Sequence, residues 1–229
     1  MNIFKQDLDK QLAEPLVDLP GSQILPRLNP DGKSVLFCSV VPGQRTCRLM
    51  SVPLTGGTPR LLTVIPDIGD FRCPKAGPCS VAQRSAQDNG YAVFELDLLK
   101  GKGREIYRDS DSHSGSPDIS PDGRWLDSPS GSKVIIRSFS TGAIVRELPF
   151  TPALNLVTLD FSPDGRGVFA GDSSRKESRQ FYLDLSGNAT LLSRQHGHSV
   201  TWGIPSPDGK HLAMLMYTID SNVCMVGGL

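Results

Sequence analysis

The 229-residue sequence has no net charge at neutral pH, because its 24 Lys and Arg residues balance 24 Asp and Glu residues. It also has no run of basic residues, so electrostatics gives no reason to expect nucleic acid or an acidic membrane surface as a partner. No apolar run approaches the roughly 18 residues of a membrane-spanning helix, and residues 1–10 lack the apolar core of a signal peptide. We therefore expect no nucleic-acid binding and no membrane contact from this chain, and the sequence leaves its compartment open.

The sequence also lacks the motifs on which catalysis and cofactor binding commonly depend. It contains no glycine-rich phosphate loop, no kinase-type catalytic loop, no Gly-x-Ser-x-Gly elbow and no helix-turn-helix pattern. No Cys-x-x-Cys pair is present, and His196-Gly197-His198 has no carboxylate or cysteine at ligand spacing, so we interpret it as a surface loop. We expect no catalytic residue, no cofactor and no metal site.

The five cysteines leave two alternatives open. Cys73 and Cys79 flank a five-residue turn, and Cys38 faces Cys47 across the bend at Pro42-Gly43. Facing cross-strand positions are close enough for a disulfide in an oxidising compartment. The alternative is that these side chains are reduced, buried and act as small apolar residues. The Cys73–Cys79 pair is the stronger candidate of the two.

What the sequence has in abundance is turns, with 23 Gly and 18 Pro residues. Three segments read Ser-Pro-Asp-Gly, a fourth reads Asn-Pro-Asp-Gly, and Pro74-Lys75-Ala76-Gly77 is a degraded fifth copy. These segments end at Gly32, Gly77, Gly123, Gly165 and Gly209, which are 42–46 residues apart.

The chemistry of the motif indicates a turn and not an acidic site. Proline sets the first central torsion of a type I turn, aspartate fits the second position, and glycine adopts a left-handed conformation at little cost. The aspartate side chain accepts hydrogen bonds from its own backbone and fixes the bend. The residues to which we give this structural role are Asp31, Gly32, Asp122, Gly123, Asp164, Gly165, Asp208 and Gly209.

The spacing of the turns predicts an all-β chain of four-stranded antiparallel meanders, which is typical of β-propeller blades. We expect a single propeller domain of about five blades over 1–229, with no helix and with a ring that is open or incomplete, as in a piece of a larger propeller. Residues 1–19 would form the last two strands of a blade, including strands over Asn2–Asp9 and Glu14–Val17. The remaining units would be complete blades at 20–64, 65–110, 111–150 and 151–195, followed by an incomplete blade at 196–229.

The residues that precede each turn motif indicate which side chains face the centre of the ring. The position directly before the motif is apolar or small, and we interpret it as packing between blades; these residues are Leu28, Cys73, Ile119, Phe161 and Pro205. The position before that, occupied by Arg27, Arg72, Asp118, Asp160 and Ile204, points the other way by strand alternation, towards a solvated central channel. Trp202 lies on the same inner strand as Ile204 and either packs under the channel or stacks on a ligand such as a sugar ring. The candidate channel or partner-binding residues are Arg27, Arg72, Asp118, Asp160 and Trp202. For the two arginines, the structural alternative is ion pairing with Asp118 and Asp160.

The motif Ser-Pro-Asp-Gly-Lys/Arg, at 120–124, 162–166 and 206–210, resembles the WD-like propeller repeats of the TolB type. The tail from Thr201 to Val223, the segment Cys73–Cys79 and the segment Lys100–Glu105 resemble more specifically the propellers that end bacterial serine/threonine protein kinases and winged-helix regulators. This resemblance implies upstream domains in a larger protein, and an extracytoplasmic location if that protein is anchored in a membrane.

Two classes of function follow from these observations. The first is a non-catalytic binding, scaffold or sensor module that engages a protein or peptide partner. The second is the propeller of an enzyme, either a five-bladed enzyme acting on glycans or the gating domain of a prolyl-oligopeptidase-type peptidase. Paired carboxylates in the channel would favour the glycan-acting enzyme.

Overall fold

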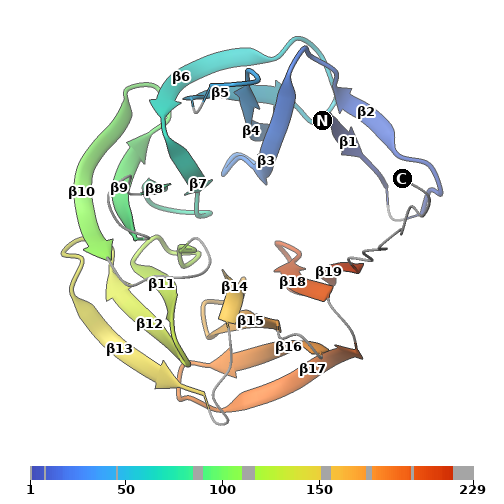
Figure 1. The fold of residues 1–229 in the computed structure, drawn as a ribbon. Helices are drawn as coiled ribbons and strands as arrows, with labels where there is room; N and C mark the ends of the chain where they lie inside the picture. Colours follow the sequence, from blue (N-terminus) through green and yellow to red (C-terminus); the bar gives the residue numbers. More distant parts are fainter. Residues whose placement is uncertain are drawn as a thin grey trace, which may run out of the picture.

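The computed structural model describes residues 2–7, 9–44, 46–84, 90–109, 117–150, 156–173, 177–196 and 199–218. All regular structure in these ranges is β-strand, and every pairing is antiparallel. The small sheets are arranged as a propeller ring (Figure 1). The predicted all-β propeller of about five blades is therefore confirmed. No helix among the described residues is long and apolar enough to cross a membrane.

Three of the sheets contain four sequential strands each. The first is β3 (Ser22–Leu28), β4 (Ser34–Val40), β5 (Thr46–Pro53) and β6 (Arg60–Pro66). The second is β7 (Ile68–Arg72), β8 (Cys79–Arg84), β9 (Tyr91–Asp97) and β10 (Gly101–Asp109). The last of these three follows a three-stranded sheet in the chain and contains β14 (Leu156–Phe161), β15 (Gly167–Ser173), β16 (Glu177–Asp184) and β17 (Ala189–His196). We refer to these sheets as blades one, two and four.

Blade three has an incomplete inner strand. It contains β11 (Trp125–Ser130), β12 (Lys133–Ser138) and β13 (Ile144–Pro149), and a strand was expected before them at Ser116–Ile119. Ser116 lies outside the described residues, and Ile119 forms only an isolated bridge with Leu126. The amide of Asp127 nevertheless donates a hydrogen bond of 3.1 Å to the carbonyl of Asp118, so this short segment occupies the inner position of the blade.

Two shorter sheets complete the described part of the ring. Strands β18 (Ser199–Pro205) and β19 (Leu212–Thr218) follow blade four, and β1 (Ile3–Lys5) pairs with β2 (Glu14–Val17) before blade one. The strand expected over Asn2–Asp9 is thus shorter than predicted, whereas Glu14–Val17 is a strand. In Figure 1, strands β3, β7, β14 and β18 lie nearest the centre, and β6, β10, β13 and β17 lie on the outside.

The core lies between successive sheets and not within any one of them. Consecutive residues of β4, namely Leu36, Phe37 and Cys38, are all fully buried, because both flat faces of the blade are covered. Leu36 joins an apolar cluster shared with blade two, and Phe37 joins one shared with the β1–β2 hairpin. Two further clusters join blade two to blade three and blade three to blade four. Each blade thus depends on its neighbours for burial, as stacked repeat units do.

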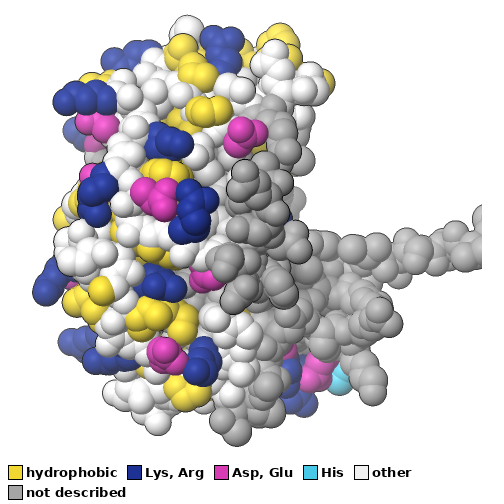
Figure 2. All heavy atoms as spheres, turned by 60° about the vertical axis from the view of Figure 1, so that its left-hand side comes forward, with side chains coloured by type: hydrophobic (Ala, Val, Ile, Leu, Met, Phe, Trp, Pro, Cys, Tyr) yellow, Lys and Arg dark blue, Asp and Glu magenta, His cyan; other side chains and the backbone are white. Residues whose placement is uncertain are grey.

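The outer face that carries β6, β10 and β13 has interspersed charges (Figure 2). Ion pairs such as Arg104–Glu95 and Lys133–Glu147 lie on these blades. Basic and acidic side chains alternate over this face, which agrees with the zero net charge and gives no single-sign patch there.

Candidate functional site at the mouth of the ring

Four turns join the innermost strand of a blade to its second strand with the same backbone hydrogen bond and an aspartate that accepts from following amides. In the turn of blade four, the amide of Gly165 donates to the carbonyl of Ser162 at 2.8 Å, which closes the bend. The carboxylate Oδ1 of Asp164 accepts from the Ser162 hydroxyl at 2.6 Å and from the amide of Arg166 at 3.0 Å. Asp122 and Asp208 make the same contacts in their turns, and Asp31 accepts from the amides of Lys33 and Ser34. These aspartates and glycines therefore stand in turn positions, Gly32, Gly123, Gly165 and Gly209 having positive φ.

The fifth turn, at Pro74–Gly77, has no aspartate and is closed by a covalent bond. The sulfur atoms of Cys73 and Cys79 are joined, with the two Cα atoms 4.2 Å apart. The loop rests on the next blade, because the amide of Ala76 donates to the carbonyl of Pro121 at 3.1 Å. The structure also joins Cys38 to Cys47 across the Pro42-Gly43 bend, where both side chains are fully buried.

The five turns surround a cavity of about 310 Å³ at one end of the ring axis, which we call the mouth. One proline from each turn lines it, together with the residue that precedes each motif. The lining residues of these two kinds are Pro30, Pro74, Pro121, Pro163 and Pro207, and Leu28, Cys73, Ile119, Phe161 and Pro205.

This placement corrects part of the sequence interpretation. The residues before the motifs were expected to pack between blades, and Ile119 and Phe161 are indeed buried in the inter-blade clusters. All five nevertheless line the mouth, and Leu28 is 43% exposed. An apolar ring with a cavity of this size falls within the range of ligand sites, which are concave and mostly apolar.

Charged side chains of different blades meet below the mouth and form the inner cluster, which consists of Arg27, Asp70, Arg72, Asp118, Asp127, Asp160 and Trp202. Arg72 lies at its middle, with Nη1 at 2.7 Å from Asp70 and Nε at 3.1 Å from Asp118. Nη2 of Arg27 lies 3.3 Å from the same Asp70. A solvated channel was expected at these positions, but the side chains of Arg72 and Asp70 are each only 7% exposed. The channel is thus filled at this level by paired charges.

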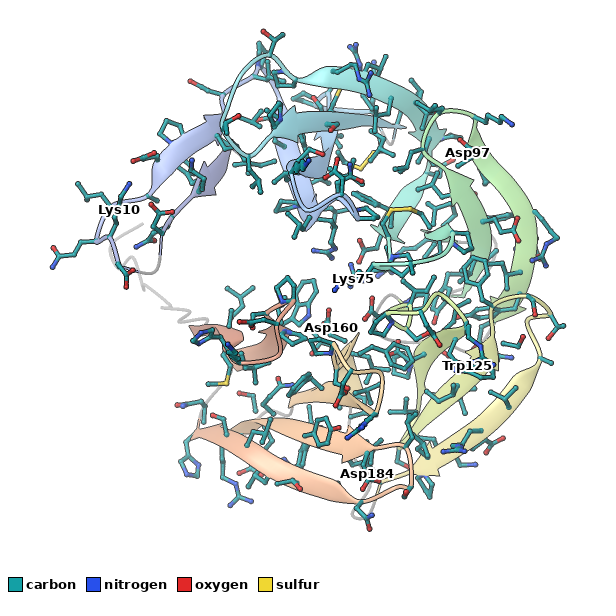
Figure 3. All side chains as sticks on the ribbon, turned by 180° about the vertical axis from the view of Figure 1, so that it is seen from behind. Lys10, Lys75, Asp97, Trp125, Asp160 and Asp184 are labelled. Atoms are coloured by element: carbon teal, nitrogen blue, oxygen red, sulfur yellow. A yellow bond between two sulfur atoms is a disulfide. The ribbon has the colours of Figure 1, made fainter. Side chains whose placement is uncertain are left out.

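Trp202 joins the same cluster from β18. Its indole Nε1 donates a hydrogen bond to Oδ2 of Asp160, and the guanidinium groups of Arg27 and Arg72 lie 5.4 and 5.7 Å from its ring centroid. The two arginines therefore contact the π-face of Trp202 while its polar edge binds a carboxylate. The five residues singled out as channel residues are brought together by the fold, and Figure 3 places Asp160 and Lys75 near the centre of the ring.

Burial gives the acidic members of this cluster unusual proton affinities. Loss of solvent raises the pKa of Asp160 to about 7, with the nearby charge of Asp118 acting in the same direction. Burial also raises the pKa of Asp118, and burial together with Asp118 holds the pKa of Asp127 well above its ordinary value. For Arg72, Asp70 and the other carboxylates outweigh the effect of burial and raise its pKa further.

Two members of the cluster were missed by sequence reasoning, although a signal for each exists. Asp70 lies two residues before Arg72 on β7 and therefore faces the same side of the strand. Asp127 faces Asp118 across the 120–125 turn, because Ile119 pairs with Leu126 and the next residue on each side therefore pairs as well. Oδ1 of Asp127 accepts a hydrogen bond of 2.7 Å from the amide of Asp118. Asp127 is a charged residue where the pattern of β11 predicts an apolar one, and it is fully buried against the inner cluster.

A bulge in β3 aims Arg27 at this cluster. Ile24 pairs with Cys38 but Arg27 pairs with Leu36, so two residues of β3 oppose one residue of β4. Leu25, in the bulge, has a φ of 55°, which is rare for a bulky residue. The extra residue reverses the side of the strand that the following side chains face relative to the residues before it. Strand alternation alone does not predict such a bulge.

The remaining sequence candidate for ligand binding, the His-Gly-His segment, falls only partly within the structure. His196 is exposed at the end of β17, and residues 197–198 lie outside the described ranges. Within the described part of the chain, no group of three or more His, Cys, Asp or Glu side chains is placed to hold a metal ion.

The fold and the mouth define a β-propeller with an apolar cavity at one end of its axis. No family model matches the chain, and no curated protein matches it in sequence. Among solved structures, TolB from Acinetobacter baumannii is similar over 95% of this chain, with a TM-score of 0.69 and 15% identity. This chain spans 57% of that TolB chain.

Two other solved structures extend the comparison. A putative TolB from Agrobacterium tumefaciens is 18% identical over 91% of this chain and 95% of its own, with a TM-score of 0.59. The periplasmic gluconolactonase of Pseudomonas aeruginosa is 17% identical over 94% of this chain and 71% of its own, with a TM-score of 0.61. At these identities the comparisons establish a TolB-like β-propeller fold, which is shared by enzymes and non-enzymes alike.

Proposed function

We propose that this propeller is a non-catalytic module that binds a protein or peptide partner at the mouth of the ring. The observation that carries the proposal is the cavity of about 310 Å³ at the mouth, whose walls come from all five turns. Leu28 and Ile204, which line it, are 43% and 40% exposed and so offer apolar surface to a ligand. Rigid turns around an apolar hollow bind an inserted side chain without loss of their own conformational freedom.

The resemblance of the turn repeats and of the tail to propellers of bacterial kinases and regulators supports a role as the sensor or scaffold part of a larger signalling protein. In that role the propeller would recognise the partner, and other domains would carry any enzymatic activity. TolB-like structures are consistent with such a module at the level of fold.

The experiment that tests the proposal is a selection of peptides from a displayed random library on the folded chain, followed by affinity measurements with purified variants. We expect Leu28→Gln combined with Ile204→Gln to weaken binding at least tenfold, since both side chains line the mouth. The control is Val145→Gln combined with Leu192→Gln, which changes two exposed apolar residues on the outer strands β13 and β17. Equal losses in both pairs of variants would contradict binding at the mouth.

A second candidate, an enzyme acting on glycans, is favoured by the carboxylates that meet in the inner cluster. Asp160, with a pKa of about 7 and a place in the wall of the mouth, has the proton affinity of a general acid. Its neighbours fit the role less well, because Asp118 is engaged by Arg72 and by the amide of Phe161, and Asp127 is fully buried. Turnover of a panel of aryl glycosides that disappears in Asp160→Asn would favour this candidate over the binding module.

A further inference from the structure

The inner cluster contains more negative than positive groups. Four carboxylates, from Asp70, Asp118, Asp127 and Asp160, accompany the two guanidinium groups of Arg27 and Arg72. Burial raises the pKa of three of these aspartates, because removing a carboxylate from solvent disfavours its charged form. The cluster as it stands is short of positive charge.

The charges that a ligand meets at the mouth are also mainly acidic. Asp118 and Asp160 line the cavity, whereas neither arginine of the inner cluster does so. The cationic residue of the lining is Lys75, whose exposed side chain stands in the disulfide-closed turn. A ligand that enters between the turns therefore approaches carboxylates at the base of the cavity.

Asp160 is the carboxylate of this pair with room for another partner. Both oxygens of Asp118 are engaged, Oδ1 by Arg72 at 3.1 Å and Oδ2 by the amide of Phe161 at 2.8 Å. Asp160 accepts a hydrogen bond from Trp202 through Oδ2. Within the part of the chain that the structure describes, no ion pair shorter than 4 Å joins Asp160 to a Lys or Arg side chain.

The walls above Asp160 suit the stem of a long cationic side chain. Prolines and apolar residues surround the cavity, and Ile204 lies on β18 two residues after Trp202, whose indole binds Asp160. Lys and Arg bury their methylene stems on apolar surface while the charged end binds a polar group. A phosphate, sulfate or carboxylate ligand would instead meet like charge at the base.

Resting on the function proposed above, we infer that the mouth recognises a Lys or Arg side chain of the peptide partner, whose cationic end pairs with Asp160 while its stem lies against the prolines and Ile204. The inserted cation supplies the positive charge that the inner cluster lacks. Lys75, at the rim, repels the incoming cation.

The test compares matched peptides on the full chain. Peptides are selected from a displayed random library at pH 8, and each Lys or Arg of the selected sequences is then replaced by citrulline or norleucine, which remove the charge and keep the length. Calorimetric titration should show at least a tenfold loss of affinity for one such replacement. On Asp160→Asn, the basic peptide should bind as weakly as its neutral version does to the wild-type chain.

Two control variants separate this pairing from general electrostatics. Glu147→Gln removes a negative charge on the outer strand β13, where Glu147 pairs with Lys133 at 2.9 Å, and it should leave the affinity unchanged. Lys75→Ala should strengthen binding about two- to threefold, the order of effect expected for one exposed charge.

The outcomes distinguish the two proposals. Selected peptides that bind at the mouth with no basic residue, or with equal affinity after citrulline replacement, would overturn the cationic recognition and leave the binding module intact. If no selected peptide responds to Leu28→Gln combined with Ile204→Gln, both proposals fail. The comparison of charged and neutral peptides uses the wild-type chain, so it does not depend on the folding of any variant.

Discussion

Asp160 and Asp164 are four residues apart in blade four, and the fold treats these identical side chains in opposite ways. Asp160 stands on the inner strand, where burial raises its pKa to about 7. Asp164 stands in the following turn with 57% of its side chain exposed, and the Ser162 hydroxyl and the Arg166 amide hold its pKa below the ordinary value. Blade three repeats the pattern with Asp118 and Asp122. Which role an aspartate takes thus depends on its position relative to the turn.

The two environments also differ in the origin of their stability. A turn aspartate is held by local hydrogen bonds from residues at most three positions away, so these contacts do not depend on other blades. Inner aspartates also have partners from other blades: Asp118 pairs with Arg72 of blade two, and Asp160 accepts from Trp202 of β18. The inner cluster therefore couples the blades, whereas the turns shape each blade separately.

The largest effect should come from removing the cation in the middle of the inner cluster. Arg72→Met leaves Asp118 buried without a cationic partner and Asp70 with Arg27 alone, and unpairing a buried charge costs about 3–5 kcal/mol. Urea unfolding followed by tryptophan fluorescence measures the loss.

The matched change at the turn is Arg166→Met, since the Arg166 side chain is 84% exposed and its Nε lies 4.0 Å from Oδ2 of Asp164. We expect its effect to stay within about 0.5 kcal/mol. Equal effects of the two substitutions would show that the inner cluster is not the element that couples the blades.

The fifth turn allows a second test, because a disulfide replaces the aspartate there. Cys73→Ser combined with Cys79→Ser opens a short loop, and the chain-entropy relation gives a loss of about 2 kcal/mol for a loop of this length. Denaturant unfolding under oxidising conditions measures it. Wild-type and variant chains compared after full reduction should differ much less, and a difference that persists after reduction would assign the loss to packing of the cysteines instead.

Much of the fold, but less of the site, could be predicted from the sequence. Four turn motifs at regular spacing indicate the meanders, because proline, aspartate and glycine act through local torsions and hydrogen bonds. Arg27, Arg72, Asp118 and Asp160 could be assigned to the centre by strand alternation, and Trp202 by its place on an inner strand. Their pairing could not, since Arg72 meets Asp70 of its own strand as well as Asp118 of blade three, and ring geometry decides which blades touch. The bulge at Leu25 is likewise invisible to alternation.

The pH dependence of the free energy of unfolding of Asp160→Asn tests whether burial at the inner position raises the pKa of Asp160. The groups that face Asp160 are Asp118, Arg72, Arg27 and Trp202, and Asp127 lies beyond Asp118. Its folded-state pKa exceeds the unfolded value, so the wild-type chain loses stability as pH rises from about 4 to about 7, while the asparagine variant lacks this loss.

We expect Asp160→Asn to be more stable than wild type by about 1–3 kcal/mol at pH 8 and to approach it near pH 4. Urea unfolding across this range gives the two curves. Glu147→Gln, on the outer strand, serves as the control and should run parallel to wild type. An asparagine variant that is less stable than wild type at pH 8 would mean that ionised Asp160 is stabilised by the arginines more than burial destabilises it.

Replacing the turn aspartate should have a smaller effect than replacing Asp160, and its pH dependence should have the opposite sign. Asp164→Ala removes the acceptor for the Ser162 hydroxyl and the Arg166 amide, which costs about 1 kcal/mol at neutral pH for a partly exposed capping carboxylate. Because the folded-state pKa of Asp164 lies below the unfolded one, its contribution is present above about pH 4 and is lost as pH falls further. Wild type and Asp164→Ala should thus converge in acid, whereas wild type and Asp160→Asn diverge as pH rises.

Asp164→Asn keeps an oxygen acceptor and should lose less stability than the alanine variant at neutral pH. If the alanine variant loses as much stability at pH 3 as at pH 7, the backbone bend and not the ionised carboxylate holds the turn. The two aspartates would then differ in burial but not in the sign of their pH dependence.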